Sequence, residues 1–172
     1  MKPAVTVEQF ARLLTLDDFE SLARSHMTEM AYEYVAAGVA DDLTLRDNRN
    51  AFERIRLLPR HLVDVSRIDT TVELFGHRHD FPVLLAPTGY HKLIHRSGEL
   101  ETVQGANQSG AILVASIFSS FSFERMSAIS TRPLWFQLYV QTDRGLTKDI
   151  VQTVLGAGCG AVCLTIDSPV NG

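Results

Sequence analysis

Residues 134–167 read LWFQLYVQTDRGLTKDIVQTVLGAGCGAVCLTID. Two short apolar runs, which begin near Leu134 and Ala161, enclose a helix-like stretch from Arg144 to Leu155. Runs that are apolar on both faces and alternate with helices are typical of a parallel sheet covered by helices. This stretch therefore predicts one strand–helix–strand unit with parallel strands.

The same rhythm begins at residue 82. Further apolar runs start near Val83 and Ala111, and helix-like stretches cover Gly98 to Gln108 and Ser122 to Ile129. Right-handed crossovers between such strands leave two architectures, a doubly wound open sheet or a barrel. A dinucleotide-binding open sheet more often carries Gly-x-Gly-x-x-Gly after its first strand, and that motif is absent from this sequence.

Polar groups at the ends of the runs favour the barrel. The four runs end in Leu85-Ala86-Pro87-Thr88-Gly89, Ala115-Ser116, Phe136-Gln137-Leu138-Tyr139 and Leu164-Thr165-Ile166-Asp167. A (β/α)₈ barrel builds its site at the carboxyl ends of its strands, and it needs eight strands and about 250 residues. This chain has 172 residues and four strand signals. The predicted fold is therefore α/β, the amino-terminal half of a (β/α)₈ TIM barrel with strands one to four.

Short helices are expected ahead of the barrel strands. Capping-box spacing occurs in two pairs, Thr6 with Gln9 and Thr15 with Asp18. A third helical pattern, from Met27 to Ala37, places Tyr34 on an apolar face and meets Gly38, a natural left-handed residue for a helix end. Asp41 or Asp42 is expected to cap a fourth helix. The expected buried side of that helix consists of Leu45, Phe52 and Ile55.

A small hairpin is expected between the helices and the barrel strands. After Pro59 the pattern changes, and the segment from Val72 to Phe81 contains two short strand signals around Gly76. The chain is thus predicted to consist of a helical lead-in (1–58), a hairpin region (59–82) and the first four β/α units (83–172).

Composition and charge exclude several classes of protein. With 45% hydrophobic and 21% charged residues the chain is in the globular range, and its net charge of −4 without a basic cluster argues against nucleic acid as a partner. No apolar stretch approaches the roughly 20 residues of a membrane span, and the first residues are too polar for a secretory signal. A cytoplasmic protein is expected.

Cysteine and histidine spacing predicts no metal site. Cys159 and Cys163 match neither a redox nor a zinc pattern and are expected to be buried free thiols. His77 and His79, beside Gly76, offer too few ligands for a metal centre.

Seven motifs stand in a fixed order along the chain. They are Tyr32-Glu33-Tyr34-x-Ala36-x-Gly38, Asn48-Arg49-Asn50-Ala51-Phe52, Pro59-Arg60, Ala86-Pro87-Thr88, Gly98-Glu99, Phe136-Gln137-Leu138-Tyr139 and Thr165-Ile166-Asp167-Ser168-Pro169. Together they resemble the amino-terminal half of the FMN-dependent 2-hydroxy-acid oxidases and dehydrogenases, the family of glycolate oxidase, lactate oxidase and mandelate dehydrogenase. The resemblance implies oxidation of a 2-hydroxy acid to a 2-oxo acid with FMN as cofactor.

The resemblance also implies roles for three residues in substrate binding and catalysis. Tyr34 matches the tyrosine that binds the substrate carboxylate, and Tyr139 matches the tyrosine that lies near the substrate oxygen and stabilises its charge. A phenol donates to an anion without the burial cost of a charge. Asp167 matches the aspartate that orients the catalytic histidine. Taken singly, Tyr34 also fits a core aromatic residue, and Tyr139 a polar residue that finishes a strand.

The flavin contacts implied by the resemblance come from the same strand ends. The backbone of Ala86, Pro87, Thr88 and Gly89 matches the loop that lies against the flavin near N5. Ser116, Gln137 and Thr165 match the side chains that bond the polar edge of the ring, where short hydroxyls and an amide suit both donors and acceptors.

Other family features differ or fall outside the chain. Phe118 stands where glycolate oxidase-like members have a tryptophan, so the substrate pocket differs in shape. The catalytic histidine, the carboxylate-binding arginine, the lysine near flavin N1 and the phosphate loops belong to the second half of the family's barrel, and His91 and His95 are wrongly placed to act as the base. The site is therefore expected to be complete only with a carboxy-terminal half, in the same chain or in another, and the complete protein to be a homo-oligomer.

Two alternatives remain open. A half barrel that is the whole product would be a non-catalytic interaction partner or remnant, because its open strand edges favour pairing with other chains. Another FMN barrel, such as the flavin-dependent isopentenyl diphosphate isomerase, is less favoured because of Tyr34 and Tyr139.

Overall fold

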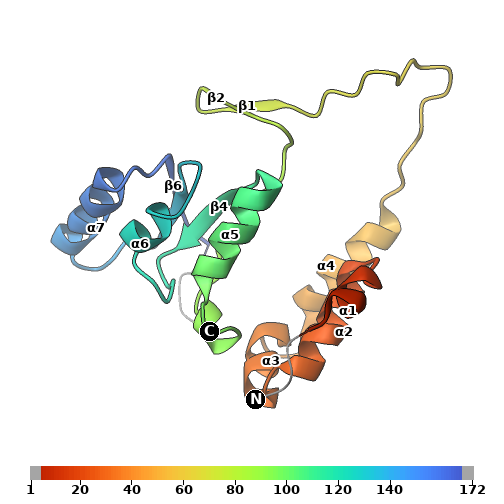
Figure 1. Cartoon of the computed structure of the whole chain (residues 1–172). Helices are drawn as coiled ribbons and strands as arrows, with labels where there is room; N and C mark the ends of the chain where they lie inside the picture. The colour runs from red at the N-terminus through yellow and green to blue at the C-terminus, as the bar shows by residue number, and fades with distance from the viewer. Residues whose placement is uncertain (1–4, 168–172) are drawn as a thin grey trace. The chain divides into compact units, whose positions relative to one another are not determined.

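The computed structural model describes residues 5–167 (Figure 1). The chain divides into two compact units, one ending at His61 and one beginning at Leu62. The first unit contains only helices, and the second contains the strands together with the remaining helices. Within residues 5–167 no helix is both long and apolar enough to cross a membrane.

Within its described residues the first unit contains four helices, and the first two begin at the predicted caps. They are α1 (Val7–Ala11), α2 (Leu16–His26), α3 (Glu29–Ala36) and α4 (Leu43–Arg54). Thr6 and Thr15 each accept the backbone N–H of the third helical residue, while Gln9 and Asp18 accept the N–H of the capping residue. Both predicted capping boxes are therefore confirmed.

Replacing Thr15 by alanine is expected to lower the free energy of unfolding of the helical unit by about 1 kcal/mol, because the Asp18 N–H at the start of α2 loses its acceptor at 3.3 Å. Thr15→Ser is the matched control, since serine keeps the hydroxyl. Urea unfolding followed by far-ultraviolet circular dichroism measures both variants. An equal loss in the serine variant would contradict the capping explanation.

Gly38 does not have the predicted left-handed conformation. Its φ is not positive, and α3 ends instead with Ala37 in an extended conformation. The Gly38 N–H donates to Asp42 Oδ1 at 2.9 Å, and an added Cβ would lie 2.7 Å from that oxygen. Gly38 is therefore needed for a close approach to Asp42, and Asp42 makes no side-chain cap for α4.

The predicted apolar faces of α3 and α4 are largely exposed. On α3 only Ala31 is buried, and Tyr34 is 61% exposed. On α4 the exposed fractions are 41% for Leu45, 81% for Phe52 and 65% for Ile55. The prediction that Leu45, Phe52 and Ile55 are buried is wrong for this chain, because periodicity identifies an apolar face but does not supply the surface that covers it.

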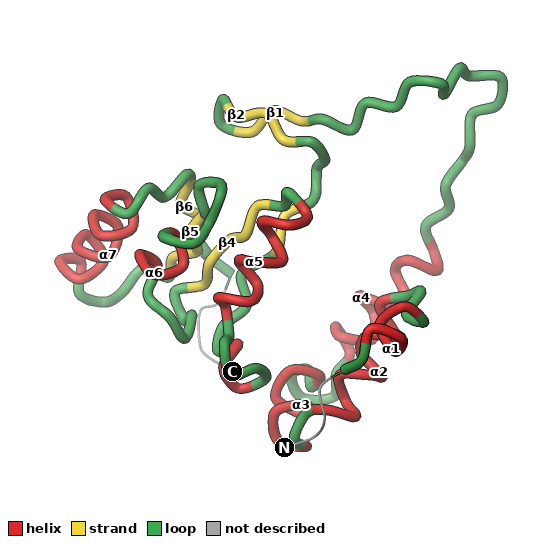
Figure 2. Tube along the Cα trace, in the orientation of Figure 1, coloured by secondary structure: helices red, strands yellow, loops and turns green. Residues whose placement is uncertain are grey.

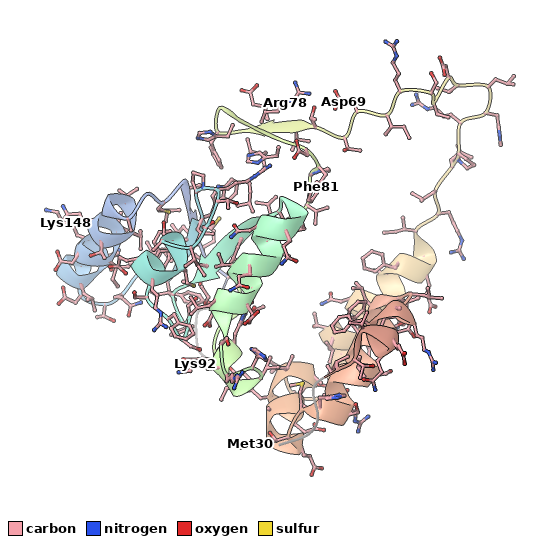
Figure 3. The ribbon with its side chains drawn as sticks, in the orientation of Figure 1. Met30, Asp69, Arg78, Phe81, Lys92 and Lys148 are labelled. Atoms are coloured by element: carbon pink, nitrogen blue, oxygen red, sulfur yellow. The ribbon has the colours of Figure 1, made fainter. Side chains whose placement is uncertain are left out.

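The predicted hairpin is confirmed in the second unit. Strands β1 (Val72–Leu74) and β2 (His77–His79) pair antiparallel through a two-residue turn. Both turn residues, Phe75 and Gly76, have positive φ, at 51° and 78°, as a primed turn requires. The Phe75 ring packs edge-on against Trp135 at 5.2 Å, which holds this non-glycine residue in place. Figure 3 labels Arg78 on the hairpin and Phe81 on the segment that follows it.

Four parallel strands confirm the predicted β/α rhythm (Figure 2). They are β3 (Leu84–Leu85), β4 (Ile112–Ser116), β5 (Trp135–Leu138) and β6 (Ala161–Leu164), in sequential order across the sheet. The connections contain α5 (Glu99–Ser109), α6 (Phe123–Ser127) and α7 (Arg144–Gly156), with a short 3₁₀ helix η1 (His91–Leu93) ahead of α5. All carboxyl ends therefore meet at one edge of the sheet.

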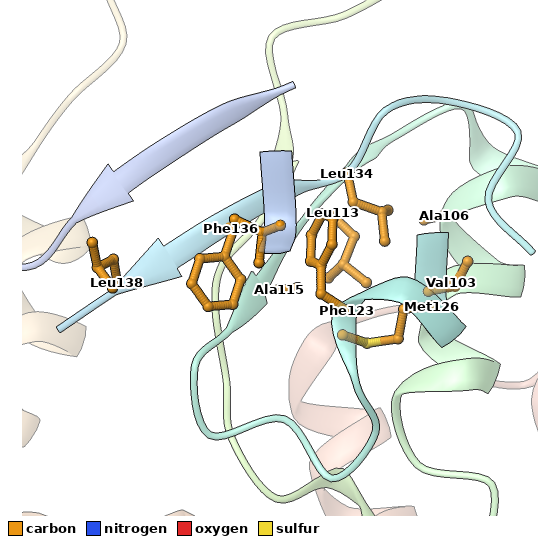
Figure 4. Packing of buried hydrophobic residues seen from close by; sticks show 10 residues of the cluster. Val103, Ala106, Leu113, Ala115, Phe123, Met126, Leu134, Phe136 and Leu138 are labelled. Atoms are coloured by element: carbon orange, nitrogen blue, oxygen red, sulfur yellow. The ribbon is translucent and has the colours of Figure 1, made fainter. Parts of the chain in front are cut away.

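The core of the second unit lies between this sheet and its helices (Figure 4). All of β4 is buried, and Phe123 of α6 meets Phe136 of β5 edge-to-face at 5.7 Å. Met126 and Val103 are at most 1% exposed. A pocket of about 380 Å³ that opens to solvent lies between α6, α7 and β5, and its lining combines core residues such as Phe136 with Glu124 and Asp149.

Both cysteines are free, as predicted, but neither is fully buried. Cys163 lies on the last strand of the described sheet, where no further strand covers it. Partial burial raises the pKa of the Cys159 thiol, which donates to the Ala161 carbonyl at 3.0 Å. The expectation that both thiols are buried is therefore only partly met.

Candidate active site

A continuous row of polar side chains crosses the carboxyl ends of three strands. The Ser116 hydroxyl, at the end of β4, donates to Gln137 Oε1 on β5 at 3.3 Å. Gln137 Nε2 donates to Thr165 Oγ1, just after β6, at 3.0 Å. Ser116 and Gln137 are 6% and 3% exposed. We call Ser116, Gln137 and Thr165 the polar row.

The polar row is held in a defined orientation. Gln137 Oε1 also accepts the Ile117 N–H at 3.3 Å, and Ser116 Oγ accepts the Phe118 N–H at 3.1 Å. Both lone pairs of the Gln137 carbonyl are therefore used, which fixes the amide orientation. Among residues 5–167, no acceptor is found for one Gln137 amide hydrogen or for the Thr165 hydroxyl hydrogen. The row thus presents neutral donors at the sheet edge.

The loop after β3 is exposed and lies close to the loop after β4. Ala86, Pro87 and Thr88 are exposed, and a Cβ added to Gly89 would lie 2.9 Å from the Cβ of Phe118. A side chain at position 89 would therefore push the two loops apart. The Thr88 hydroxyl makes a short hydrogen bond with His91 Nε2, so it is already engaged within its own loop.

Three aromatic rings from successive loops line up beside the polar row. Tyr90 stacks on Phe118 with ring centroids 5.7 Å apart, and Phe118 contacts Tyr139 at 5.6 Å. Tyr139 directly follows β5, and its carbonyl accepts Gln141 Nε2 at 2.9 Å. The stacking of Tyr90 was not foreseen, because no local pattern in the sequence relates residue 90 to residue 118.

Within residues 5–167, no hydrogen bond joins Tyr34 or Asp167 to the polar row. Tyr34 is on α3 in the first unit, and Asp167 is exposed just after β6. Their roles in substrate binding and catalysis stay predictions. Ser168 and Pro169, the end of the last motif, lie outside the described residues.

Glu99 is a buried carboxylate near these loops. It belongs to the motif Gly98-Glu99, but that motif predicted no role for Glu99. It begins α5, is 2% exposed, and accepts the N–H of Ser120 at 2.8 Å and of His91 at 3.1 Å through Oε1. Burial raises the pKa of Glu99, but the N–H donors of Ser120, Glu99 itself and His91 outweigh burial and hold it below the ordinary value. The carboxylate is therefore ionised at neutral pH.

Because the pKa of Glu99 is lower in the folded protein, part of the free energy of unfolding depends on pH. As the pH falls, the Glu99 carboxylate takes up a proton in the unfolded chain before it does so in the folded protein. Its stabilising effect is therefore complete above the pKa that it has in the unfolded chain, and is lost as the pH falls through the pKa that it has in the folded protein. We expect Glu99→Gln to reduce the difference in free energy of unfolding between neutral and acidic pH, measured by urea unfolding. Glu101→Gln, an exposed position on the same helix, should leave that difference unchanged. Identical pH profiles for all three proteins would contradict this role.

No metal centre accompanies these side chains. Within the part of the chain that the structure describes, no group of three or more His, Cys, Asp or Glu residues could hold a metal ion.

The sequence profile of the FMN-dependent dehydrogenases matches residues 23–172. The chain belongs to the FMN-dependent dehydrogenase family. Its curated relatives include an L-lactate oxidase of Nostoc sp., 41% identical over 163 residues, and the glycolate oxidase of Spinacia oleracea, 36% identical over 157 residues. These alignments cover 92% and 91% of the chain, but 45% and 42% of the relatives. The chain thus spans about half the length of these FMN-dependent dehydrogenase relatives.

Solved structures give the same result for the fold. A mandelate oxidase crystal structure with 3,3-difluoro-2-hydroxy-3-phenylpropionic acid superposes with a TM-score of 0.88 and 34% identity, covering 92% of this chain and 47% of that one. A mandelate oxidase crystal structure with (S)-2-phenylpropionate gives a TM-score of 0.89 at 33% identity, covering 93% of this chain and 48% of that one. The prediction of half a (β/α)₈ barrel is confirmed.

The donor set fits the cofactor of the FMN-dependent dehydrogenases. A flavin ring has a polar edge with carbonyl oxygens and nitrogens, and the polar row offers neutral donors in one line. The exposed backbone of Ala86–Gly89 lies after the neighbouring strand β3. These residues therefore suit the ring of FMN.

Proposed function

We propose that this chain supplies part of the active site of an enzyme that oxidises a 2-hydroxy acid to a 2-oxo acid with FMN. The polar row at the ends of β4, β5 and β6 is the observation that supports this most directly. Its remaining donors are neutral and lie at the carboxyl ends of the strands, and the exposed residues Ala86–Thr88 follow the neighbouring strand β3. A flat cofactor with a polar edge matches that arrangement.

Each predicted residue has a role in this proposal. Ser116, Gln137 and Thr165 bind the ring edge of FMN, and the backbone of residues 86–89 lies against the ring. Tyr34 binds the substrate carboxylate, Tyr139 stabilises charge on the substrate oxygen, and Asp167 orients a histidine. Bound FMN supplies the acceptor for the two electrons that leave the substrate.

The proposal includes a contribution from the region of the relatives that this chain does not span. A proton acceptor for the substrate hydroxyl and a cation for its carboxylate are also needed, because the polar row consists of uncharged side chains and supplies neither a base nor a positive charge. We propose that both come from that region, in the same chain or in another.

The exposed edge of β6 favours a second candidate function. Val162 and Leu164 of β6 are 37% and 54% exposed, and an unpaired apolar strand edge attracts other strands. A half barrel that binds a partner without catalysis would use the same edge.

Anaerobic mixing with 2-hydroxy acids separates the two candidates. The protein is isolated from its natural source with whatever remains bound to it, saturated with FMN, and exposed to a panel of small and aromatic 2-hydroxy acids. We expect the visible flavin absorbance to bleach and the 2-oxo acid to accumulate. Lack of bleaching across the panel, with FMN shown to be bound, would reject the oxidase and favour the partner-binding function.

A further inference from the structure

Glu99 connects the two loops that carry the flavin-facing backbone and the aromatic stack. Its Oε1 accepts one N–H from His91, in the segment after β3, and one from Ser120, in the loop after β4. Two further hydrogen bonds join the same segments, from Tyr90 N to the Phe118 carbonyl at 3.0 Å and from Lys92 N to Ser120 Oγ at 3.2 Å. Figure 3 labels Lys92 beside the start of α5.

Helix α5 also holds the side chain of His91. His91 Nδ1 is hydrogen-bonded to Thr102 Oγ1 at 2.9 Å, and Nε2 makes the short contact with Thr88. Thr102 lies three residues after Glu99, so both contacts come from one face of the helix. The Thr88 side chain is thereby linked through His91 to the same helix that holds Ser120.

The burial of Glu99 is costly for a purely structural contact. A buried carboxylate needs hydrogen bonds to all its lone pairs, and Glu99 Oε2 is buried without a partner among the described residues. A neutral amide could accept the same two N–H groups without a buried charge. The carboxylate, however, accepts stronger hydrogen bonds than an amide would, because charge-assisted hydrogen bonds are about twice as strong as neutral ones.

We propose that Glu99 is a positioning residue that fixes the loop after β3 against the loop after β4. Its two charge-assisted hydrogen bonds keep Tyr90 stacked on Phe118 and keep the Ala86–Gly89 backbone at a fixed distance from that stack. In the proposed function, on which this role rests, the fixed distance sets the width of the space for the flavin and the substrate side chain. Glu99 acts through these loops and touches neither ligand.

Amide hydrogen exchange tests the connection without any ligand. In Glu99→Gln the His91 and Ser120 amides are expected to exchange about tenfold faster, since the charge-assisted part of both bonds is lost. The amides of β4 should keep their rates. Glu101→Gln is the matched control and should change neither amide. Unchanged exchange of His91 and Ser120 in Glu99→Gln would overturn the proposal.

The variant Glu99→Asp tests whether the length of the side chain matters in addition to its charge. Aspartate keeps the charge but is shorter by one methylene, so it is expected to protect at most one of the two amides. Protection of both amides in the aspartate variant would show that charge alone matters and would overturn the positioning role. The aspartate variant also keeps the test decisive if Glu99→Gln does not fold.

Binding of FMN, followed by quenching of its fluorescence, provides the second measurement. The dissociation constant of FMN is expected to rise about tenfold in Glu99→Gln and to stay unchanged in Glu101→Gln, with both variants shown to be folded by circular dichroism. Faster exchange with unchanged FMN affinity would show a structural role only and would overturn the proposal. Failure of the unaltered protein to bind FMN would reject the proposed function instead, and the exchange rates would still decide whether Glu99 ties the loops.

Discussion

Replacing Tyr139 by phenylalanine is expected to lower kcat of the flavin-loaded protein by about 10²–10³-fold. In the proposed function its hydroxyl stabilises charge that develops on the substrate oxygen, and losing one such donor costs that much in other enzymes. The ring should stay in place without the hydroxyl, because Phe118 contacts it at 5.6 Å and its backbone is held by Gln141. Steady-state rates of 2-oxo acid formation measure the effect.

Tyr32→Phe is the matched control for this variant. The Tyr32 hydroxyl donates to Glu20 at 3.1 Å within the helical unit, so its loss removes a hydrogen bond of the same kind outside the site. We expect kcat to be unchanged. A Tyr139→Phe enzyme with normal kcat and a raised KM would assign Tyr139 to ground-state binding of the substrate and contradict a role in the transition state.

The strand ends of the site could be predicted because they follow a rule of the fold. Once four apolar runs alternate with helices, parallel pairing places every carboxyl end at one edge. The predicted strand ends include Ser116, Gln137 and Thr165, which the family resemblance singled out as flavin contacts, and the structure joins them in one hydrogen-bonded row. The spacing of apolar residues carries this information, since a buried parallel strand needs no polar face.

Contacts between distant segments could not be predicted in the same way. A glutamate at the start of a helix is normally exposed, yet Glu99 is buried because it meets N–H groups 8 and 21 residues away in the sequence. Gly38 was expected in a left-handed conformation, but its role depends on the carboxylate of Asp42. The apolar side of α4 was identified from periodicity, although Phe52 is 81% exposed. In each case the missing information was the partner surface.

The core under β5 should be the most sensitive part of the second unit. Phe136→Ala is expected to lower the free energy of unfolding by about 3–5 kcal/mol, because Phe136 is 5% exposed and meets Phe123 edge-to-face at 5.7 Å. The aromatic pair itself accounts for about 0.5–1.5 kcal/mol of that loss. Removing the ring would also widen the open pocket that Phe136 lines between α6, α7 and β5.

Fluorescence of the single tryptophan reports this loss selectively. Trp135 precedes Phe136 on β5 and packs against Phe75 of the hairpin turn, so its emission should change when the second unit unfolds in urea. Phe52→Ala, at an exposed position in the helical unit, should shift the transition by less than about 0.5 kcal/mol. Equal effects of the two substitutions would mean that Phe52 becomes covered in solution. That result would identify the apolar face of α4 as part of an interface and not as free surface.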